Sequence, residues 1–481
     1  MPNSIKKKYF FNLLNTISGM LFPLITFPYA SRIMQADGIG QVNFFQSIIG
    51  YISLFTCLGI PMYAVRAIAR VRDDVKMRNR VAMEILSLHL SLSFIGYIIV
   101  GIVAFFVPQV QSNIPLFFLL SLSILFTAIG CDWFYQGIED FKYITIRGVV
   151  IKILSVAILF ITVKTKNDLM WYGFYSVFGT LGGNIFNFFR LRKYNSEYPI
   201  SVSDINIIQH IKPIFHVSIF TLIVSVYLNL NVVMLGLMKN NEAVGLFSAA
   251  TKITSLCLGI VGAMQSVLIP QMSNLLALGK RKEFAELSQK SLSFSLFISL
   301  PMTVGIILTA PYLIPLLAGP SYSPAIIVLQ IMAGVVLMSP ISGVFGLQIL
   351  YPLGKEKLVV ICAAVSAVIN VVLNIVLIPR YSYTGVAVST LFTESVNTVI
   401  MIVFAKSYSS VKWNCRSNWN YLLASVVMGG LVWLFQQNLH STGIGLFLIS
   451  VSVGFISYFS ILFLRKDQVS ELILQFAKRK L

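Results

Sequence analysis

Long apolar stretches run through most of the chain, and polar residues gather in the short segments between them. Each stretch is close to the ~20 residues that an α-helix needs to cross a bilayer. The strands of a membrane barrel would instead alternate apolar and polar residues over about ten positions. Fourteen stretches can be delimited, at residues 9–33, 41–65, 82–107, 114–137, 144–163, 170–189, 214–237, 243–270, 291–317, 324–350, 358–379, 385–405, 420–437 and 443–464. The pattern predicts an all-α, polytopic membrane protein with fourteen transmembrane helices.

Composition excludes the main soluble alternatives. Of the 481 residues, 57% are apolar and 11% are charged, whereas about 25% are charged in an ordinary soluble domain. A soluble chain of this composition would have far more apolar surface than one core can bury. A soluble enzyme, a nucleic-acid-binding module and a disordered protein are therefore excluded, and no nucleic acid is expected as a partner.

The distribution of basic residues predicts the orientation. The chain has 36 Lys and Arg against 17 Asp and Glu. Lys and Arg concentrate in cytoplasmic loops, and most of the 36 fall in segments on the same side as the N-terminus. The residues on the opposite side are Arg32, Lys164, Lys166, Lys239 and Arg380. Both termini are therefore expected in the cytoplasm.

A weak internal repeat divides the chain. Ile39-Gly40 opens the second predicted span, and Val244-Gly245 opens the eighth, six spans later. A repeat of an even number of spans keeps its orientation and predicts two parallel six-helix lobes with a cleft between them. The predicted parts are an N-terminal lobe at 1–205, a C-terminal lobe at 206–410, two further helices at 411–465 and an amphipathic cytoplasmic tail at 466–481.

Motifs for catalysis are missing from the sequence. It contains no HExxH zinc motif, no GxxxxGK[ST] phosphate loop and no dinucleotide-binding loop between a strand and a helix. We therefore expect no enzymatic activity, no metal and no bound cofactor. Transport would be driven by a gradient or by the solute itself, because no cytoplasmic segment is long enough for a nucleotide-hydrolysing domain.

Charged residues within the apolar stretches are the candidate functional residues. A charge near the bilayer centre costs ~2.5–3.5 kcal/mol on insertion scales and usually faces a cavity. Arg32, Arg147, Lys152 and Lys252 predict a cationic cavity that binds an anion such as phosphate or diphosphate. For Arg32 and Arg147, the alternative is a side chain that reaches the membrane surface.

Two acidic residues also lie in apolar stretches. Asp132 and Glu394 are candidates for ion coupling, and the alternative for both is an ion pair with a nearby basic residue.

The first and seventh spans are unusually polar, which suits helices that line a cleft. Asn15 and Asn229 are candidate lining residues. Pro23 and Pro28 interrupt the backbone hydrogen bonds of the first span and predict a bend that gates the cleft. The alternative is ordinary helix packing through small and polar residues.

Three segments carry a resemblance to a known family. They are PYASRIMQADGIGQVNFFQSIIGYISLFTCLGI at 28–60, DWFYQGIEDFKYITIRGVVIK at 132–152 and NVVLNIVLIPRYSYTGVAVSTLFTE at 370–394. Together they resemble the polysaccharide transporter family, which includes the O-antigen flippases of Wzx type and belongs to the multidrug/oligosaccharidyl-lipid/polysaccharide exporter superfamily.

The resemblance implies two six-helix lobes and two C-terminal helices, with alternating access between inward- and outward-open states. It also implies that a proton or sodium gradient drives transport. It implies that an undecaprenyl-diphosphate-linked oligosaccharide moves from the cytoplasmic to the periplasmic leaflet of the bacterial inner membrane. Membrane lipids and the glycan polymerase machinery are the implied partners. Arg32, Asp132, Arg147, Lys152 and Glu394 match positions typical of the family.

Other functions remain as alternatives at this point. A peptidoglycan lipid-precursor flippase shares the fourteen helices, and a drug/cation antiporter of the same superfamily usually has twelve and an acidic cavity. A membrane-embedded glycan polymerase or ligase would be expected to have a large periplasmic loop, which this sequence lacks.

Overall fold

The computed structural model describes residues 3–197, 205–408, 411, 416–438 and 443–467. Within these ranges, the side chains of residues 3–17, 20–21, 195–197 and 216–229 lie outside the description. Every regular element in the described part is helical, and the chain divides into two compact units, Met1–Gly245 and Leu246–Leu481.

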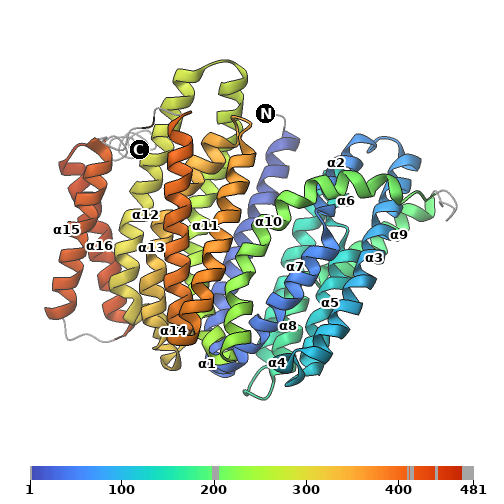
Figure 1. The fold of residues 1–481 in the computed structure, drawn as a ribbon, viewed down its shortest axis with the longest axis horizontal. Coiled ribbons are helices and arrows are strands. Elements are labelled where there is room, and N and C mark those ends of the chain that lie inside the picture. The colour runs from blue at the N-terminus through green and yellow to red at the C-terminus, as the bar shows by residue number, and fades with distance from the viewer. Residues whose placement is uncertain (1–2, 198–204, 409–410, 412–415, 439–442, 468–481) are drawn as a thin grey trace. The chain divides into compact units, whose positions relative to one another are not determined.

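The first unit contains ten helices in its described part (Figure 1). These are α1 (Asn3–Cys57), α2 (Ile60–Arg70), α3 (Val75–Phe106), α4 (Pro108–Gln111), α5 (Ile114–Gly130), α6 (Asp132–Gly137), α7 (Phe141–Thr162), α8 (Leu169–Leu181), α9 (Gly183–Glu197) and α10 (Ile208–Met238). Exposed apolar side chains cover the outer face of α3, among them Phe94, Phe105 and Phe106. Such a surface suits contact with lipid rather than water.

Helix α11 (Asn241–Ala277) begins in the first unit and continues into the second. The other helices of the second unit are α12 (Arg281–Ala318), the short 3₁₀ turn η2 (Pro320–Tyr322), α13 (Ala325–Gly343), the π-helix η3 (Val344–Leu350), α14 (Glu356–Lys406), α15 (Arg416–Asn438) and α16 (Ile444–Leu464).

Two helices contain a sharp break. Helix α1 has 55 residues and leaves helical geometry at Gln35, with φ 55° and ψ −179°. Helix α14 has 51 residues and breaks at Ser382, with φ 51° and ψ −131°. At 1.5 Å per residue, a straight helix of either length would be more than twice as long as the ~30 Å hydrocarbon core is thick. Both breaks coincide with predicted loops, at 34–40 and 380–384.

The two motifs of the weak repeat pack against each other. A side chain at Gly40 would meet the backbone of Asn241, and a side chain at Gly245 would meet the backbone of Ala36. The corner after the break in α1 therefore lies directly on the start of α11. Since neither position has room for a Cβ atom, glycine is required at both.

The membrane class is confirmed by the helices. In the part of the chain that is described, ten helical stretches are long and apolar enough to cross a membrane. Predicted spans 114–137 and 170–189 each contain two helices, with breaks at Cys131 (φ 45°) and between α8 and α9. The number fourteen and the predicted boundaries of the lobes stay predictions.

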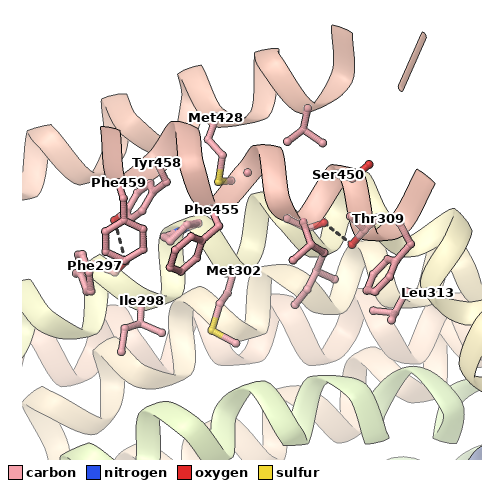
Figure 2. Close-up of a pocket in the computed structure, with 17 residues that line it drawn as sticks. Phe297, Ile298, Met302, Thr309, Leu313, Met428, Ser450, Phe455, Tyr458 and Phe459 are labelled. Atoms are coloured by element: carbon pink, nitrogen blue, oxygen red, sulfur yellow. Dashed lines mark hydrogen bonds between the residues drawn. The ribbon is translucent and has the colours of Figure 1, made fainter. Parts of the chain in front are cut away.

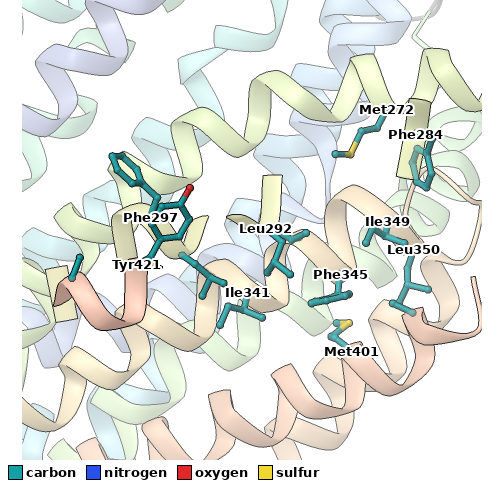
Figure 3. Packing of buried hydrophobic residues seen from close by; sticks show 14 of the residues in the cluster. Met272, Phe284, Leu292, Phe297, Ile341, Phe345, Ile349, Leu350, Met401 and Tyr421 are labelled. Atoms are coloured by element: carbon teal, nitrogen blue, oxygen red, sulfur yellow. The ribbon is translucent and has the colours of Figure 1, made fainter. Parts of the chain in front are cut away.

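Aromatic packing joins the last two helices to the rest of the second unit (Figure 3). Phe297 of α12 contacts Tyr421 of α15 edge to face, with ring centroids 5.5 Å apart. The hydroxyl of Tyr458 on α16 donates a hydrogen bond to the carbonyl of Phe297 at 2.8 Å. These contacts fix α15 and α16 on α12, and they define one wall of a groove described below.

Candidate functional site

A cavity of about 250 Å³ lies within the first unit, between α6, α7, α8 and α9. We call it the Arg147 cavity. Its lining residues are Asp132, Gln136, Ile144, Arg147, Gly148, Ile151, Lys152, Gly179, Thr180, Gly183 and Asn184. Two basic residues and one acidic residue face it, so the lining carries a net positive charge. Three of the residues predicted from charges in apolar stretches therefore share one cavity.

Arg147 forms the centre of this cavity through an ion pair. Its Nη2 lies 2.9 Å from Oδ1 of Asp132, in the first turn of α6. The Arg147 side chain is 11% exposed and that of Asp132 is 42% exposed. Asn187 of α9 is fully buried and donates from Nδ2 to the same Asp132 oxygen at 2.8 Å, while the hydroxyl of Tyr135 donates to the Asn187 carbonyl. The carboxylate is thus held in place from two helices.

The absence of a side chain at Gly183 leaves space for the Arg147 side chain between α7 and α9. A Cβ atom at Gly183 would lie 3.0 Å from Nε and 3.2 Å from Cδ of Arg147. The guanidinium also lies over the ring of Tyr143, 5.9 Å from its centroid. Arg190 covers the same ring at 3.9 Å and forms an ion pair with Asp140 at 2.9 Å. Arg147 is therefore packed on backbone and on an aromatic ring rather than extended into open space.

The remaining hydrogen-bonding capacity of Arg147 is not used within the described residues. Nε and Nη1 are buried and make no hydrogen bond there. A buried donor without a partner costs free energy, and an arginine can bind a carboxylate or phosphate through two parallel N–H groups. The arrangement is suited to an oxyanion, provided that the surrounding side chains open to admit it.

Lys152 lies five residues further along α7 and extends the positive charge toward α1. Its Nζ donates to Oγ of Ser18 at 2.9 Å, and the side chain is half-buried. The Ser18 hydroxyl is neutral and does not compensate the charge of the Lys152 ammonium group, whereas the Asp132 carboxylate compensates the charge of Arg147. Of the two cations, Lys152 is therefore the one that supplies the net charge of the cavity.

A second hollow, in the second unit, is almost entirely apolar (Figure 2). This groove of about 430 Å³ lies between α12, α15 and α16, and we call it the α12–α16 groove. Met302, Met428 and Phe455 line its middle, and Thr309 and Ser450 lie at one end. Thr309 donates its hydroxyl to the carbonyl of Gly305 at 2.6 Å, so the groove offers few polar groups. Its chemistry suits a hydrocarbon chain.

Known proteins resemble this chain in sequence and in fold. The family model described as "Polysaccharide biosynthesis protein" matches residues 5–276, which is more than half of the chain. The chain belongs to this polysaccharide biosynthesis protein family. A protein named as an O-antigen transporter of Escherichia coli (strain K12) is 25% identical over 390 residues, which cover 81% of this chain and 94% of the relative.

A second similar protein is named as a low-salt glycan biosynthesis flippase of Haloferax volcanii. It is 22% identical over 254 residues, covering 52% of this chain and 54% of that protein. Among solved structures, the lipid II flippase MurJ in an inward closed conformation superposes with a TM-score of 0.76 at 15% identity, covering 96% of this chain and all of that one. That likeness shows that the two proteins share a fold.

Three of the charged residues predicted to form the functional site lie outside the Arg147 cavity. Arg32 is exposed and donates from Nη1 to the carbonyl of Pro28 at 3.2 Å, one turn earlier in α1. Lys252 in α11 and Glu394 in α14 are half-buried residues of the second unit. Their roles in substrate binding and ion coupling stay predictions.

The two prolines predicted to form a gating bend lie in the described part of the chain. Pro23 and Pro28 both lie inside α1, and the non-helical residue is Gln35, seven positions after Pro28. A gating bend at the prolines stays a prediction. The side chains of Asn15 and Asn229 lie outside the described residues, although their backbones belong to α1 and α10.

A buried acidic residue, Glu84, was missed by the sequence reasoning. It is fully buried in α3 and accepts hydrogen bonds from Arg80 Nε (3.1 Å), the Asn206 backbone N–H (2.9 Å) and Gln209 Nε2 (2.8 Å). His210 Nε2 lies 2.9 Å from Glu84 Oε2, and its Nδ1 lies 2.7 Å from the hydroxyl of Tyr63 on α2. This Glu84 network fastens the start of α10 to α2 and α3. Glu84 lies in predicted span 82–107, so the rule that selected Asp132 applied to it as well.

Proposed function

We propose that this protein is a flippase that moves an undecaprenyl-diphosphate-linked oligosaccharide, such as an O-antigen or capsule repeat unit, from the cytoplasmic to the periplasmic leaflet of the bacterial inner membrane. The observation that carries the proposal is the Arg147 cavity in a member of this family. Arg147 and Lys152 converge there inside a membrane domain, where a cationic cavity is costly and marks a transport pathway. The names of the relatives support the same class of cargo.

The diphosphate would bind at Arg147 and Lys152. A phosphate oxygen competes with Asp132 for the guanidinium, because both are oxyanions that prefer the same N–H edge. Protonation of Asp132, or a sodium ion bound to it, would weaken the ion pair of 2.9 Å and release Arg147 for the substrate. A proton or sodium gradient could therefore change the affinity of Arg147 for the substrate directly, through Asp132.

The lipid part of the substrate would remain in apolar surroundings. Burying each CH₂ group of a hydrocarbon chain in such surroundings contributes about 0.8 kcal/mol. The glycan polymerase machinery would take up the product on the periplasmic side, and the protein itself would make or break no covalent bond.

The topology that we propose for this function has fourteen helices with both termini in the cytoplasm. The breaks at Gln35 and Ser382 divide two of the ten long apolar stretches into pairs of spans. The pair α8–α9 and helix α10 supply the remaining two. The excess of Lys and Arg in the loops on the side of the N-terminus supports the orientation.

Deletion of the gene in its native host tests the proposal. We expect one undecaprenyl-diphosphate-linked oligosaccharide to accumulate in extracted lipids and the corresponding surface glycan to be lost. The wild-type gene should restore the glycan, and a gene carrying Arg147→Gln should not, although its protein reaches the membrane. Arg192→Gln is the matched control, because Arg192 is an exposed arginine of α9. An intact surface glycan with no accumulated lipid would contradict the proposal.

A further inference from the structure

A second polar hollow lies beside the π-helix η3 in the second unit. This π-helix pocket has a volume of about 230 Å³ and is formed by α11, α13, η3 and α14. Its lining residues are Leu258, Gly262, Gln265, Ser339, Pro340, Ser342, Gly343, Gly346, Leu347, Val359 and Met401. No lining residue is charged, so its chemistry differs from that of the Arg147 cavity.

The π-helix that forms one wall is firmly supported. Gln348 of η3 is fully buried; its Oε1 accepts from Ser291 Oγ at 2.5 Å and its Nε2 donates to the Gln265 carbonyl at 3.0 Å. On the other side, Phe345 and Ile349 pack into the apolar core (Figure 3). π-helices are rare and occur frequently at functional sites. Contacts on both sides therefore hold the π-helix in place as one wall of the pocket.

The polar groups that remain for a ligand are mainly acceptors. Gln265 Nε2 donates to the Pro340 carbonyl at 2.7 Å and to Ser295 Oγ at 3.1 Å, so both of its N–H groups are used. The Pro340 carbonyl requires a donor, which fixes the orientation of the amide. Oε1 therefore lies on the side of Gly343, where a Cβ atom would come within 2.7 Å of it, and no described residue donates to it.

The serine hydroxyls add to this pattern. Ser342 donates its hydroxyl to the Ser339 carbonyl at 3.0 Å, which leaves its oxygen as an acceptor. The Ser339 hydroxyl lines the same pocket and can donate or accept. A ligand that donates hydrogen bonds and carries no negative charge therefore suits this pocket.

We propose that the π-helix pocket binds an uncharged sugar residue of the lipid-linked glycan, an inference that rests on the function proposed above. Sugar hydroxyls donate hydrogen bonds to acceptors such as Gln265 Oε1, and the C–H faces of the ring pack on apolar side chains such as Leu347 and Met401. A phosphate is a poor ligand, because its oxygens would face acceptor oxygens. The pocket volume of about 230 Å³ is many times the ~10–15 Å³ that a single bound water requires, so a ligand larger than one water fits.

Gly262 gives access to a test that leaves the π-helix and its hydrogen bonds intact. It lines the pocket, and no atom lies within 4 Å of a Cβ built at this position. Gly262→Leu therefore fills the pocket without a clash at the backbone. Gly101→Leu is the matched control, because Gly101 of α3 is exposed and equally open, and it belongs to the first unit.

The experiment measures binding of two probes to the purified full-length protein in lipid nanodiscs. The probes are undecaprenyl diphosphate and the undecaprenyl-diphosphate-linked oligosaccharide that accumulates in the deletion host. We expect the wild type and Gly101→Leu to bind the sugar-bearing lipid at least tenfold more tightly than the bare lipid. Gly262→Leu should lose this difference while its Kd for the bare lipid stays unchanged. Ser342→Ala, which removes one acceptor, should reduce the difference about threefold.

The outcomes separate this inference from the proposed function. Equal affinity of the wild type for both lipids, or an unchanged difference in Gly262→Leu, would overturn the sugar site and leave the flippase proposal standing. A Gly262→Leu variant that loses only a sodium dependence of binding would reassign the pocket to a cation and overturn the inference. Failure of the wild type to bind either lipid would overturn both proposals.

Discussion

The guanidinium of Arg147 is positioned by groups that are far from it in sequence. Asp132 pairs with it, Asn187 holds Asp132, and Gly183 leaves the space in which it lies. A charge in an apolar stretch was enough to select Arg147, Lys152 and Asp132 from the sequence, because such charges are costly in a membrane. The pairing itself and the roles of Asn187 and Gly183 depend on contacts between distant helices, which periodicity does not encode.

Gly183 offers a test at this scale. In Gly183→Ala, the new Cβ atom would lie 3.0 Å from Arg147 Nε, so the guanidinium must move by a few tenths of an ångström. We expect transport to fall about tenfold, equivalent to ~1.4 kcal/mol of lost substrate interaction, with normal amounts of protein in the membrane. Restoration of the surface glycan by graded expression in the deletion host measures the effect. Gly101→Ala is the control, and equal transport by both variants would argue against this role for Gly183.

Helices of the first unit are joined by the Glu84 network as well as by apolar packing. A fully buried carboxylate is stable only when its oxygens are hydrogen-bonded, and Glu84 receives such bonds from α3 and from the segment that starts α10. Sequence reasoning predicted the helices around it from their apolar length. It did not predict that the polar start of α10 folds back on α3, because the donors lie more than a hundred residues away.

Glu84→Gln should therefore destabilise the first unit. The amide cannot accept from every donor that now surrounds the carboxylate, and removing one partner of a buried ion pair costs about 3–5 kcal/mol. We expect a lower Tm for the purified protein in detergent. Glu283→Gln is the matched control, because the Glu283 side chain is 54% exposed in its ion pair with Lys280 and exposed pairs contribute at most about 1 kcal/mol. Identical Tm values for the two variants would mean that the network does not hold α10.

For the whole molecule, the order of the apolar stretches was the most informative part of the sequence. It predicted the multi-pass class and the loops where α1 and α14 break, since a polar interruption must leave the hydrocarbon core. Gln35 and Ser382 themselves were not identifiable, because neither residue type is favoured at positive φ. The π-helix was equally hidden, since its sequence reads as an ordinary apolar helix.

Gly40 provides a prediction for the whole molecule. Gly40→Ala introduces a Cβ atom where the backbone of Asn241 lies, and backbone cannot yield as a flexible side chain does. We expect much less of this variant in the membrane fraction, as measured by immunoblot. Gly50→Ala, on the same helix with open space around the position, should accumulate like the wild type. Normal levels of Gly40→Ala would mean that this corner can separate from α11.

The contact between the two repeat motifs also limits how this chain can recombine with its relatives. Gly40 packs against the backbone of Asn241, four residues before Gly245. Gly245 packs against the backbone of Ala36, four residues before Gly40. A chimera that joins the first half of this chain to the second half of another relative keeps this fit only if the donor also has glycine, with the same backbone path, at the position of Gly245. We expect exchanges of single loops or of the last two helices to be tolerated more readily than exchanges that divide this pair.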